Sequence, residues 1–281
     1  MQILETIQAF REAHAALSGT LGLVPTMGYL HAGHLELVRR ARAECEYVAV
    51  SIFVNPTQFG PNEDLGRYPR DVPRDLELLR AEGVDLVLLP HVDEIYPPGY
   101  STYVEVEGMN AVLEGVRRPG HFRGVATVVC KLFNIAQAQR AYFGQKDAQQ
   151  TVVIRRMVRD LAMPTEIVIV PTVREADGLA MSSRNVYLDP EQRAAAPVLY
   201  RGLQQVVTLY ERGERNAPML RAALENELAQ EPLAQVEYVS IADLVGLQEI
   251  DGPIAEGALV SLAVRFGTTR LIDNVILEPA A

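Results

Sequence analysis

The sequence predicts an α/β protein in which a Rossmann-like, doubly wound parallel sheet is followed by a smaller C-terminal α+β domain. From the N-terminus to about residue 172, strand-like apolar runs alternate with amphipathic helical segments, which is the pattern of a parallel sheet. Beyond that point, helical segments are followed by strands that can pair with one another. We therefore expect two domains, residues 1–172 and residues 173–281.

The first domain is expected to contain strands and helices in regular succession. Residues 47–54 form an almost uninterrupted apolar run, which is typical of a strand covered on both faces. Residues 125–136 form a strongly apolar helix, which we expect to be buried either against the sheet or against a second subunit. The other expected helices are 5–16, one that begins near residue 31, 73–82 and one that ends near 161, and the other expected strands are 21–24, 84–89, 102–106, 141–143 and 166–170.

The second domain is expected to contain helices first and strands afterwards. The helical segments are 191–211 and 218–229, and the strands are 236–241, 258–266 and 270–277. Gly267, Thr268 and Thr269 lie between the last two strands and are expected to turn a hairpin. Helices followed by pairable strands indicate a small α+β domain.

Composition and charge exclude several classes of protein. Hydrophobic residues make up 48% of the 281 residues, yet no apolar run reaches the length of a membrane span. The N-terminus lacks the basic start and long apolar core of a signal peptide, so we expect a cytoplasmic protein without a membrane segment. The net charge of −10 argues against nucleic acid as a partner, because that affinity depends on neutralising phosphates with Lys and Arg. Cys45 and Cys130 lack the spacing of a metal site.

The stretch from Val24 to His34 reads as the end of a strand, a loop and the start of a helix. Pro25 is expected to end the strand, and Gly28 to allow a tight turn. Gly33 removes a side chain where a ligand must approach the backbone closely. The chemistry of a site is therefore expected at the start of this helix.

His31 and His34 are three residues apart, so both imidazoles project to one side if the helix begins near His31. Free backbone N–H groups at a helix start, together with two ring donors, would suit a phosphate group. The alternative is that the two histidines are helix caps or surface residues. The glycine between them and the preceding strand favour the anion site.

Lysine is rare in this chain, since 26 residues are Lys or Arg and only Lys131 and Lys146 are lysines. A retained lysine can mark a place where a compact ammonium is needed, although chance survival explains Lys131 equally well. Lys146 lies in the sequence Gly144-Gln145-Lys146-Asp147, between an expected strand and an expected helix. This turn is not a Walker A loop, and no Gly-x-Gly-x-x-Gly follows the first strand. Lys146 is nevertheless well placed to meet phosphate.

Residues 173–185 are polar and rich in hydroxyl groups, and we interpret them as a mobile loop at the domain boundary. Within this loop, Met181-Ser182-Ser183-Arg184 offers two hydroxyl donors and a guanidinium. Such a segment could close on a triphosphate.

Three of these blocks together resemble the signatures of the His-x-Gly-His nucleotidyltransferase superfamily: His31 to His34, the lysine turn, and Met181 to Arg184. Longer blocks are similar to the pantothenate synthetase family in particular. These are the stretches 25–34, 53–59, 147–150 and 174–185. The resemblance implies an ATP-dependent ligase that joins pantoate to beta-alanine through a pantoyl adenylate and releases AMP and pyrophosphate.

The resemblance also implies which residues carry the chemistry. His34 matches a proton donor, and His31 and Lys146 would neutralise the pentacovalent phosphorus centre. The residues implied for ATP binding are Met27, Gly28, His31, Gly33, His34, Gly144, Lys146, Asp147, Val173, Met181, Ser182, Ser183 and Arg184. The residues implied for pantoate and beta-alanine are Thr26, Asn55, Gln58 and Gln150.

Other implications concern the metal and the assembly. The family turn usually carries Glu where this chain has Gln145, a change that should spare the role of Lys146. Mg²⁺ is required with ATP and is expected mainly on phosphate oxygens. Asp75 and Asp147 are candidate ligands, and no protein ligand is assigned. The family resemblance implies a homodimer.

Three other functions compete with this interpretation. A plain nucleotidyltransferase would share the histidines but would not need Gln58 and Gln150. An ATP sensor without turnover is disfavoured by the joint presence of both histidines, Lys146 and the serine loop. An aminoacyl-tRNA synthetase is disfavoured by the short chain and its acidic charge.

Overall fold

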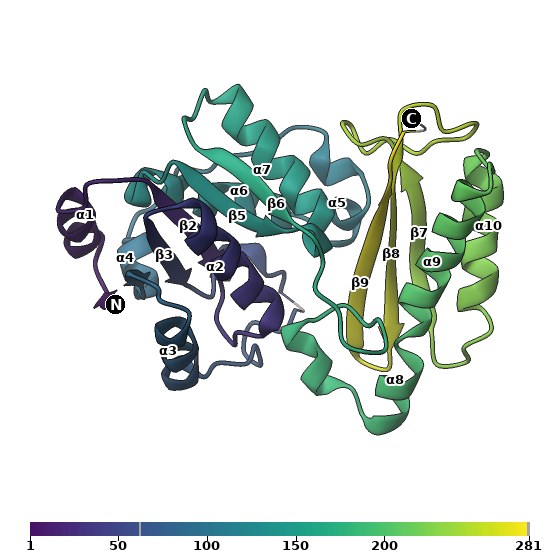
Figure 1. Ribbon diagram of the computed structural model, residues 1–281, viewed down its shortest axis with the longest axis horizontal. Coiled ribbons are helices and arrows are strands. Elements are labelled where there is room, and N and C mark those ends of the chain that lie inside the picture. The colour runs from purple at the N-terminus through teal and green to yellow at the C-terminus, as the bar shows by residue number, and fades with distance from the viewer. Residues whose placement is uncertain (62, 280–281) are drawn as a thin grey trace. The chain divides into compact units, whose positions relative to one another are not determined.

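The protein is described here by a computed structural model that covers residues 1–61 and 63–279 (Figure 1). The chain divides into two compact units. The first comprises Met1–Gln145 and Gln149–Pro171, and the second comprises Lys146–Ala148 and Thr172–Ala281. The last two residues of the expected second domain, 280 and 281, lie outside the described residues.

The first unit is built on a six-stranded parallel sheet with the strand order β1-β4-β3-β2-β5-β6. The chain leaves β2 toward β3 and β4 on one side, whereas β5 and β6 lie on the other side. The direction of winding therefore reverses between β2 and β5, where open α/β sheets bind ligands at the carboxyl ends of their strands. The strands are β1 (Gln2–Leu4), β2 (Leu21–Thr26), β3 (Tyr47–Ile52), β4 (Leu86–Leu88), β5 (Arg140–Gly144) and β6 (Glu166–Val170).

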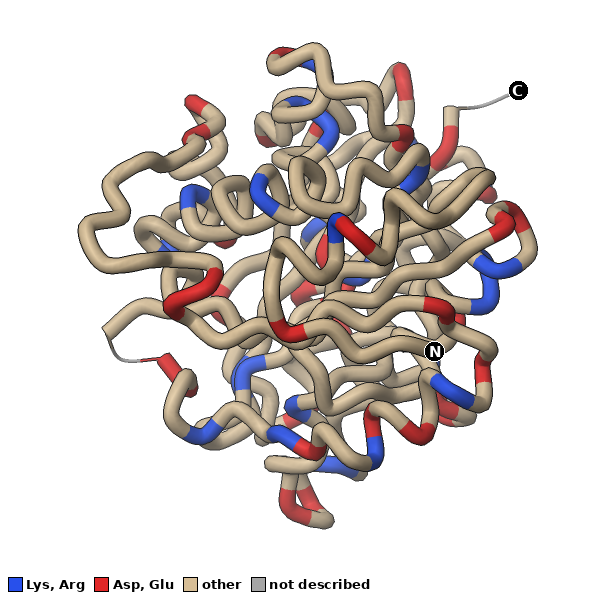
Figure 2. The backbone as a smooth tube through the Cα atoms, turned by 90° about the vertical axis from the view of Figure 1, so that its left-hand side faces the viewer, with Lys and Arg blue, Asp and Glu red and all other residues tan. Residues whose placement is uncertain are grey.

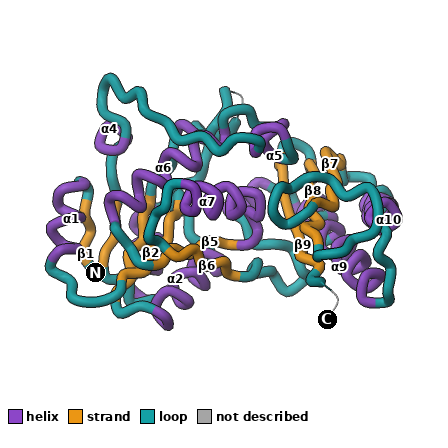
Figure 3. Tube along the Cα trace, turned by 90° about the horizontal axis from the view of Figure 1, so that it is seen from above, coloured by secondary structure: helices purple, strands orange, loops and turns teal. Residues whose placement is uncertain are grey.

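Helices cover both faces of this sheet, which confirms the predicted doubly wound class. Figure 3 shows α6 and α7 on one side of the strands and α2 on the other. On the α2 side, Val38 and Leu79 from the helices pack with Val24, Val50 and Val87 from the strands. The helices are α1 (Ile7–Ala15), α2 (Ala32–Glu44), α3 (Val72–Ala81), α4 (Val92–Ile95), α5 (Glu114–Arg117), α6 (His121–Ala136) and α7 (Ala148–Asp160), with short 3₁₀ helices η1 (Pro56–Gln58), η2 (Met109–Ala111) and η3 (Gln145–Asp147).

The second unit contains a three-stranded antiparallel sheet of order β7-β8-β9, in agreement with the predicted α+β domain. Leu199 and Leu203 from α9 and Leu224 from α10 pack with Val260 and Leu262 of β8 in one buried core. The elements are η4 (Ser183–Tyr187), α8 (Pro190–Ala195), α9 (Val198–Glu211), α10 (Ala217–Leu228), β7 (Gln235–Ala242), β8 (Ala258–Phe266) and β9 (Thr269–Leu277).

Proline positions account for two differences from the expected elements. Strand β2 does not end before Pro25 but continues to Thr26. Pairing with β5 stops at Leu23, so Pro25 lies where β2 is paired only with β3, and a missing N–H is tolerated there. The expected helix 191–211 is two helices, because Pro197 lacks the N–H that a helix interior needs, and it is instead the N-cap that precedes α9.

Two further differences concern short strands. Residues 102–106 form no strand, and Val104 instead bonds through its N–H to the hydroxyl of Thr127 at 3.0 Å. The edge strand β1 was not predicted, because three residues are too few to show a strand period.

Helix α6 is buried by its own chain. Twelve of its 16 residues are buried in the single subunit, among them Phe122, Val125 and Phe133. Of the two environments expected for this helix, burial inside the chain is therefore the correct one, and its apolar sequence is no argument for a second subunit.

Charge is mixed along the chain, with Lys and Arg interspersed among Asp and Glu in the view of Figure 2. Among the described residues, no helix combines the length and the apolar character that crossing a membrane requires.

Candidate active site

The loop after β2 makes the tight turn that was expected. Gly28 has φ 82° and Tyr29 has φ 50°, so two consecutive residues adopt left-handed conformations. A Cβ atom on Gly28 would lie 3.0 Å from the Ile52 side chain and 3.1 Å from an Asp75 oxygen. The hydroxyl of Thr26 accepts the Gly28 N–H at 3.2 Å and donates to the Ser51 carbonyl at 2.8 Å. The loop therefore requires glycine at position 28, and the hydrogen bonds of the Thr26 side chain help to hold the loop in this conformation.

Asp75 from α3 holds the other half of this turn. Its two oxygens accept the N–H groups of Tyr29 and Leu30, each at 2.7 Å, and its side chain is 1% exposed. Burial raises the pKa of Asp75, although both hydrogen bonds and Arg74 oppose that shift. Asp75 was a candidate metal ligand on sequence grounds, yet here it orients the loop, a role that no local sequence signal could reveal.

His31 and His34 meet at the start of α2, as the sequence predicted, with ring centroids 4.1 Å apart. His31 is the N-cap, and its Nδ1 accepts the Gly33 N–H at 3.1 Å. Nδ1 of His34 in turn accepts the His31 N–H at 3.3 Å. Because each Nδ1 is an acceptor, the proton of each neutral ring is on Nε2. Two Nε2–H donors are thus fixed by one capping box.

The helix start differs in one respect from what was expected. The N–H of Gly33 is bound by the His31 ring, and the N–H of His34 bonds to the His31 carbonyl at 2.9 Å. These two groups are therefore engaged within the chain rather than free for an anion. The two interpretations of the histidines, as helix caps and as donors to an anion, are therefore compatible. Each ring accepts a backbone N–H at Nδ1 and carries its proton on Nε2.

Asn55 organises the loop after β3. It is 1% exposed, and its Nδ2 donates to Gln58 Oε1 at 3.1 Å and to the Gly124 carbonyl at 3.2 Å. Its Oδ1 accepts the hydroxyls of Thr57 and Tyr96, each at 2.9 Å. Gln58 in turn donates from Nε2 to the Met27 sulfur at 3.0 Å, so the loops after β2 and β3 are in contact.

The two adjacent glutamines on α7 differ in their surroundings. Gln149 is buried, accepts the Glu114 N–H at 2.9 Å and donates to the carbonyls of Met109 and Val112. Gln150, one residue on, is partly exposed. Two neighbouring residues on the helix point in different directions, so one amide is buried and bonded to the backbone while the next is partly exposed.

The serine segment belongs to the second unit and is more ordered than a simple loop. Residues 174 and 180 pair as an antiparallel bridge, and the Ser182 hydroxyl caps η4 by accepting the Arg184 N–H at 3.2 Å. Arg174 forms a two-pronged ion pair with buried Asp273, at 2.6 and 3.0 Å. The guanidinium of Arg174 also lies 3.8 Å from the Tyr200 ring centroid.

Lys146 lies two residues after the end of β5 and belongs to the second unit. Its Nζ is 3.7 Å from Asp147, and its carbonyl accepts the Asn274 side-chain N–H at 2.9 Å. Asn274 follows Asp273, so the lysine turn and the Arg174 ion pair are both anchored to the same stretch of β9. The sequence predicted the strand itself but contained no signal that Asp273 and Asn274 would bond to these two segments.

A cavity of about 420 Å³ opens at the carboxyl ends of β2, β3 and β4 in the first unit. Of the expected site residues, only Met27 and Gly28 line it, together with Tyr29, Phe53 and Asp75 among others. In the described part of the chain, no group of three or more His, Cys, Asp or Glu side chains could hold a metal ion.

The sequence matches the family described as Pantoate-beta-alanine ligase over residues 2–276. It is 66% identical over 278 residues to the pantothenate synthetase of Chloroflexus aurantiacus, covering 99% of each chain. It is 65% identical to that of Roseiflexus castenholzii, covering 99% of this chain and all of the relative.

Solved structures agree with this match. A pantothenate synthetase from Thermus thermophilus superposes with a TM-score of 0.94 at 51% identity, over 99% of this chain and 100% of that one. A pantoate-beta-alanine ligase from Francisella tularensis, solved with beta-gamma ATP and beta-alanine, has a TM-score of 0.79 at 34% identity, over 98% and 97% of the two chains. The family resemblance is thereby confirmed, and the chain belongs to the pantoate-beta-alanine ligase family, the pantothenate synthetases.

Proposed function

We propose that this chain condenses pantoate with beta-alanine to pantothenate, and that it uses ATP through a pantoyl adenylate. A pantoate carboxylate oxygen attacks the α-phosphorus of ATP, and the bond to the leaving pyrophosphate breaks. The amine of beta-alanine then attacks the pantoyl carbonyl, loses a proton and expels AMP. The observation that carries the proposal is the pair of fixed Nε2–H donors at the winding reversal of a sheet whose family is the pantoate-beta-alanine ligases.

The first step joins two anions, so positive charge and hydrogen-bond donors at the transferring phosphoryl group are its main requirement. His34 would donate a proton or hydrogen bond there, and His31 and Lys146 would offset the charge of the pentacovalent centre. The capping box supports this assignment, because donors held in place before the substrate binds need no rearrangement during the reaction.

Pantoate would be held by the amides of Gln58 and Gln150, since an amide both donates to and accepts from a hydroxy acid. Asn55 and Thr26, expected at this site, are buried and bonded to the chain. We assign them to holding Gln58 and the turn at Gly28 rather than to contacting pantoate.

ATP would be bound by residues of both units. Met27, Gly28, Gly33 and Gly144 come from the first, and Asp147, Val173 and Met181 to Arg184 from the second. Ser182 supports this assignment, because its hydroxyl oxygen caps η4 while its own proton can still be donated to phosphate. We further propose that the second unit acts as a lid that closes over the nucleotide.

Mg²⁺ would accompany ATP. Both Asp75 oxygens already accept backbone N–H groups. This fits a magnesium ion that is coordinated mainly by phosphate oxygens better than one coordinated mainly by protein side chains. The ion would neutralise phosphate charge there. We further propose a homodimer, which the family resemblance implies and which sedimentation would measure, and a cytoplasmic location.

The test follows pyrophosphate and AMP release separately. Wild type should release pyrophosphate from ATP and pantoate alone, and AMP only after beta-alanine is added. His34→Ala and Lys146→Ala should each lose roughly two orders of magnitude in turnover. His14→Ala, on α1, is the histidine control and should match wild type. Binding of ATP without adenylation of pantoate would refute the proposed acid substrate and favour a plain nucleotidyltransferase.

A further inference from the structure

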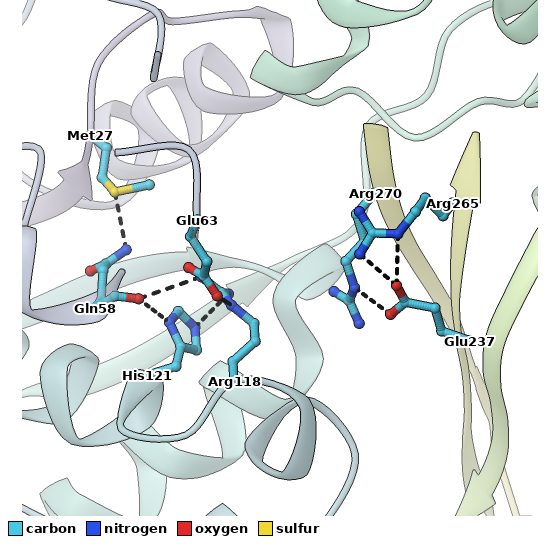
Figure 4. A network of polar contacts seen from close by, with 8 residues as sticks. All are labelled: Met27, Gln58, Glu63, Arg118, His121, Glu237, Arg265 and Arg270. Carbon is cyan, nitrogen blue, oxygen red and sulfur yellow. Dashed lines mark hydrogen bonds and ion pairs between the residues drawn. The ribbon is translucent and has the colours of Figure 1, made fainter. Parts of the chain in front are cut away.

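A buried histidine contacts the backbone of the proposed pantoate-binding loop. His121, the first residue of α6, is 9% exposed, and its Nδ1 lies 2.8 Å from the carbonyl oxygen of Gln58 (Figure 4). Arg118 donates to the same carbonyl at 3.4 Å. The loop itself offers little backbone support at this point, because the Gln58 N–H reaches the Asn55 carbonyl only at 3.4 Å.

The partners of His121 determine its tautomer. A carbonyl oxygen only accepts, so Nδ1 must carry the proton that is donated to Gln58. The Arg118 guanidinium only donates, and it lies 3.0 Å from Nε2, which must therefore be unprotonated. This is the opposite tautomer from His31 and His34.

Arg118 is fixed in turn by Glu63. The two side chains form a two-pronged ion pair with both distances at 2.7 Å, and they are 20% and 25% exposed (Figure 4). Burial opposes ionisation of Glu63, but the pair with Arg118 lowers the pKa of that carboxyl. Burial, and then the charge of Arg118, lower the pKa of His121 to about 4, against the opposing charges of Glu63 and Glu114. The histidine is thus neutral at physiological pH.

Helix α6 also contacts the loop directly. A Cβ atom on Gly124, one turn after His121, would lie 2.4 Å from the Thr57 carbonyl oxygen. The Gly124 carbonyl accepts a hydrogen bond from Asn55, which in turn donates to the Gln58 amide. The first turn of α6 therefore contacts both the backbone of Gln58 and the residue that orients its side chain.

We propose that His121 is a positioning residue for Gln58, and that Arg118 and Glu63 orient it so that its Nδ1–H holds the Gln58 backbone in the conformation that binds pantoate. This inference rests on the proposed function. The three residues act through Gln58 and touch no substrate themselves, so they set the KM for pantoate and leave the KM for ATP unchanged.

The kinetic test compares two substitutions of one residue. His121→Leu removes the donor to Gln58, whereas His121→Asn keeps an N–H donor close to the position of Nδ1. We expect His121→Leu to raise the KM for pantoate roughly tenfold with the KM for ATP within about twofold, and His121→Asn to restore most of the loss. Long-range ¹H–¹⁵N spectra of wild type should show His121 protonated at Nδ1.

Arg118→Met tests whether the Glu63–Arg118 pair acts through His121, and it does so without altering the histidine itself. Arg42→Met is its matched control. Arg42 likewise pairs with a carboxylate, Asp85, and bonds backbone carbonyls in the same unit, but it lies where α2 ends and β3 begins, at the amino end of the strands. We expect Arg118→Met to raise the KM for pantoate and Arg42→Met to leave it unchanged. If His121→Leu does not fold, His121→Asn and Arg118→Met decide the question.

The outcomes separate the two proposals. A wild type that releases no pyrophosphate from ATP and pantoate overturns the proposed function and this inference with it. An active wild type overturns the inference alone if Arg118→Met keeps the wild-type KM for pantoate, if both KM values rise together, or if His121 is protonated at Nε2.

Discussion

Three histidines of the first unit have their protonation sites fixed by backbone groups. His31 and His34 accept N–H groups at Nδ1, whereas His121 donates from Nδ1 to a carbonyl. The same side chain consequently presents an Nε2–H donor at the start of α2 and an Nε2 acceptor at the start of α6. The first arrangement suits contact with an anionic ligand, and the second suits contact with a guanidinium.

The buried state of His121 should make stability depend on pH. In the unfolded chain its pKa is about 6.5, and in the native protein it is about 4. Between these values the unfolded state binds more protons, so the free energy of unfolding rises with pH through this window. The stabilisation is complete above pH 6.5 and is lost as pH falls toward 4. Over pH 5 to 7.5 the effect should be about 2 kcal/mol.

Urea unfolding of wild type and His121→Asn across that range measures this contribution. The other histidines and the carboxylates titrate in both proteins and largely cancel in the difference. We expect the stability difference to move in favour of wild type as pH rises. Two curves that stay parallel from pH 5 to 7.5 would show that His121 does not titrate as its surroundings indicate.

Individual residues differ in how far the sequence alone reveals their place. His31, His34 and Gly28 lie within one strand, loop and helix start, so local pattern was enough to place them together. Asp75 and His121 act on loops that are distant along the chain, and only the folded sheet brings them there. Catalytic and binding roles for the expected site residues stay predictions.

At the scale of elements, the carboxyl ends of the parallel strands decide which loops can meet. The type of most strands and helices followed from periodicity, because buried strands are continuously apolar and helices repeat every three or four residues. Strand ends were less predictable, as β2 shows by continuing through Pro25. Proline is tolerated inside β2 because the pairing of β2 with β5 stops at Leu23. The sequence of a single strand does not reveal where its pairing with a neighbour stops.

Helix α7 provides a matched pair of substitutions at this scale. Gln149 bonds to three backbone groups of the segment that includes η2 and α5, so Gln149→Leu should cost about 1–3 kcal/mol of stability through unpaired buried groups. Gln150→Leu should change stability by less than about 0.5 kcal/mol but should raise the KM for pantoate. Chemical unfolding and steady-state kinetics on both variants separate the roles. Equal effects of the two substitutions on stability would contradict the distinction.

At the scale of the whole molecule, each unit encloses a hydrophobic core of its own. The change in pattern near residue 172 led us to expect domains of residues 1–172 and 173–281, and that domain assignment stays a prediction. The compact units of the structure divide between Pro171 and Thr172. The sequence could not predict that Lys146–Ala148 groups with the second unit, where the Asn274 side chain bonds to the Lys146 carbonyl, because a contact between residues so distant along the chain leaves no local pattern. The proposed nucleotide-binding residues are thus distributed over two separately packed bodies.

Thermal unfolding should reveal whether ATP engages both of these bodies. A ligand that binds only the native state at about 100 times its Kd stabilises by about 2.7 kcal/mol. If ATP binds residues of both units, calorimetry should show that the melting temperatures of both units rise. Their unfolding transitions should merge into a single transition as the nucleotide concentration increases. His14→Ala should behave like wild type, whereas Lys146→Ala should weaken the effect on the second unit. A nucleotide that raises the melting temperature of the first unit alone would contradict the lid assignment, because the proposed phosphate contacts of Ser182, Ser183 and Arg184 would then not form.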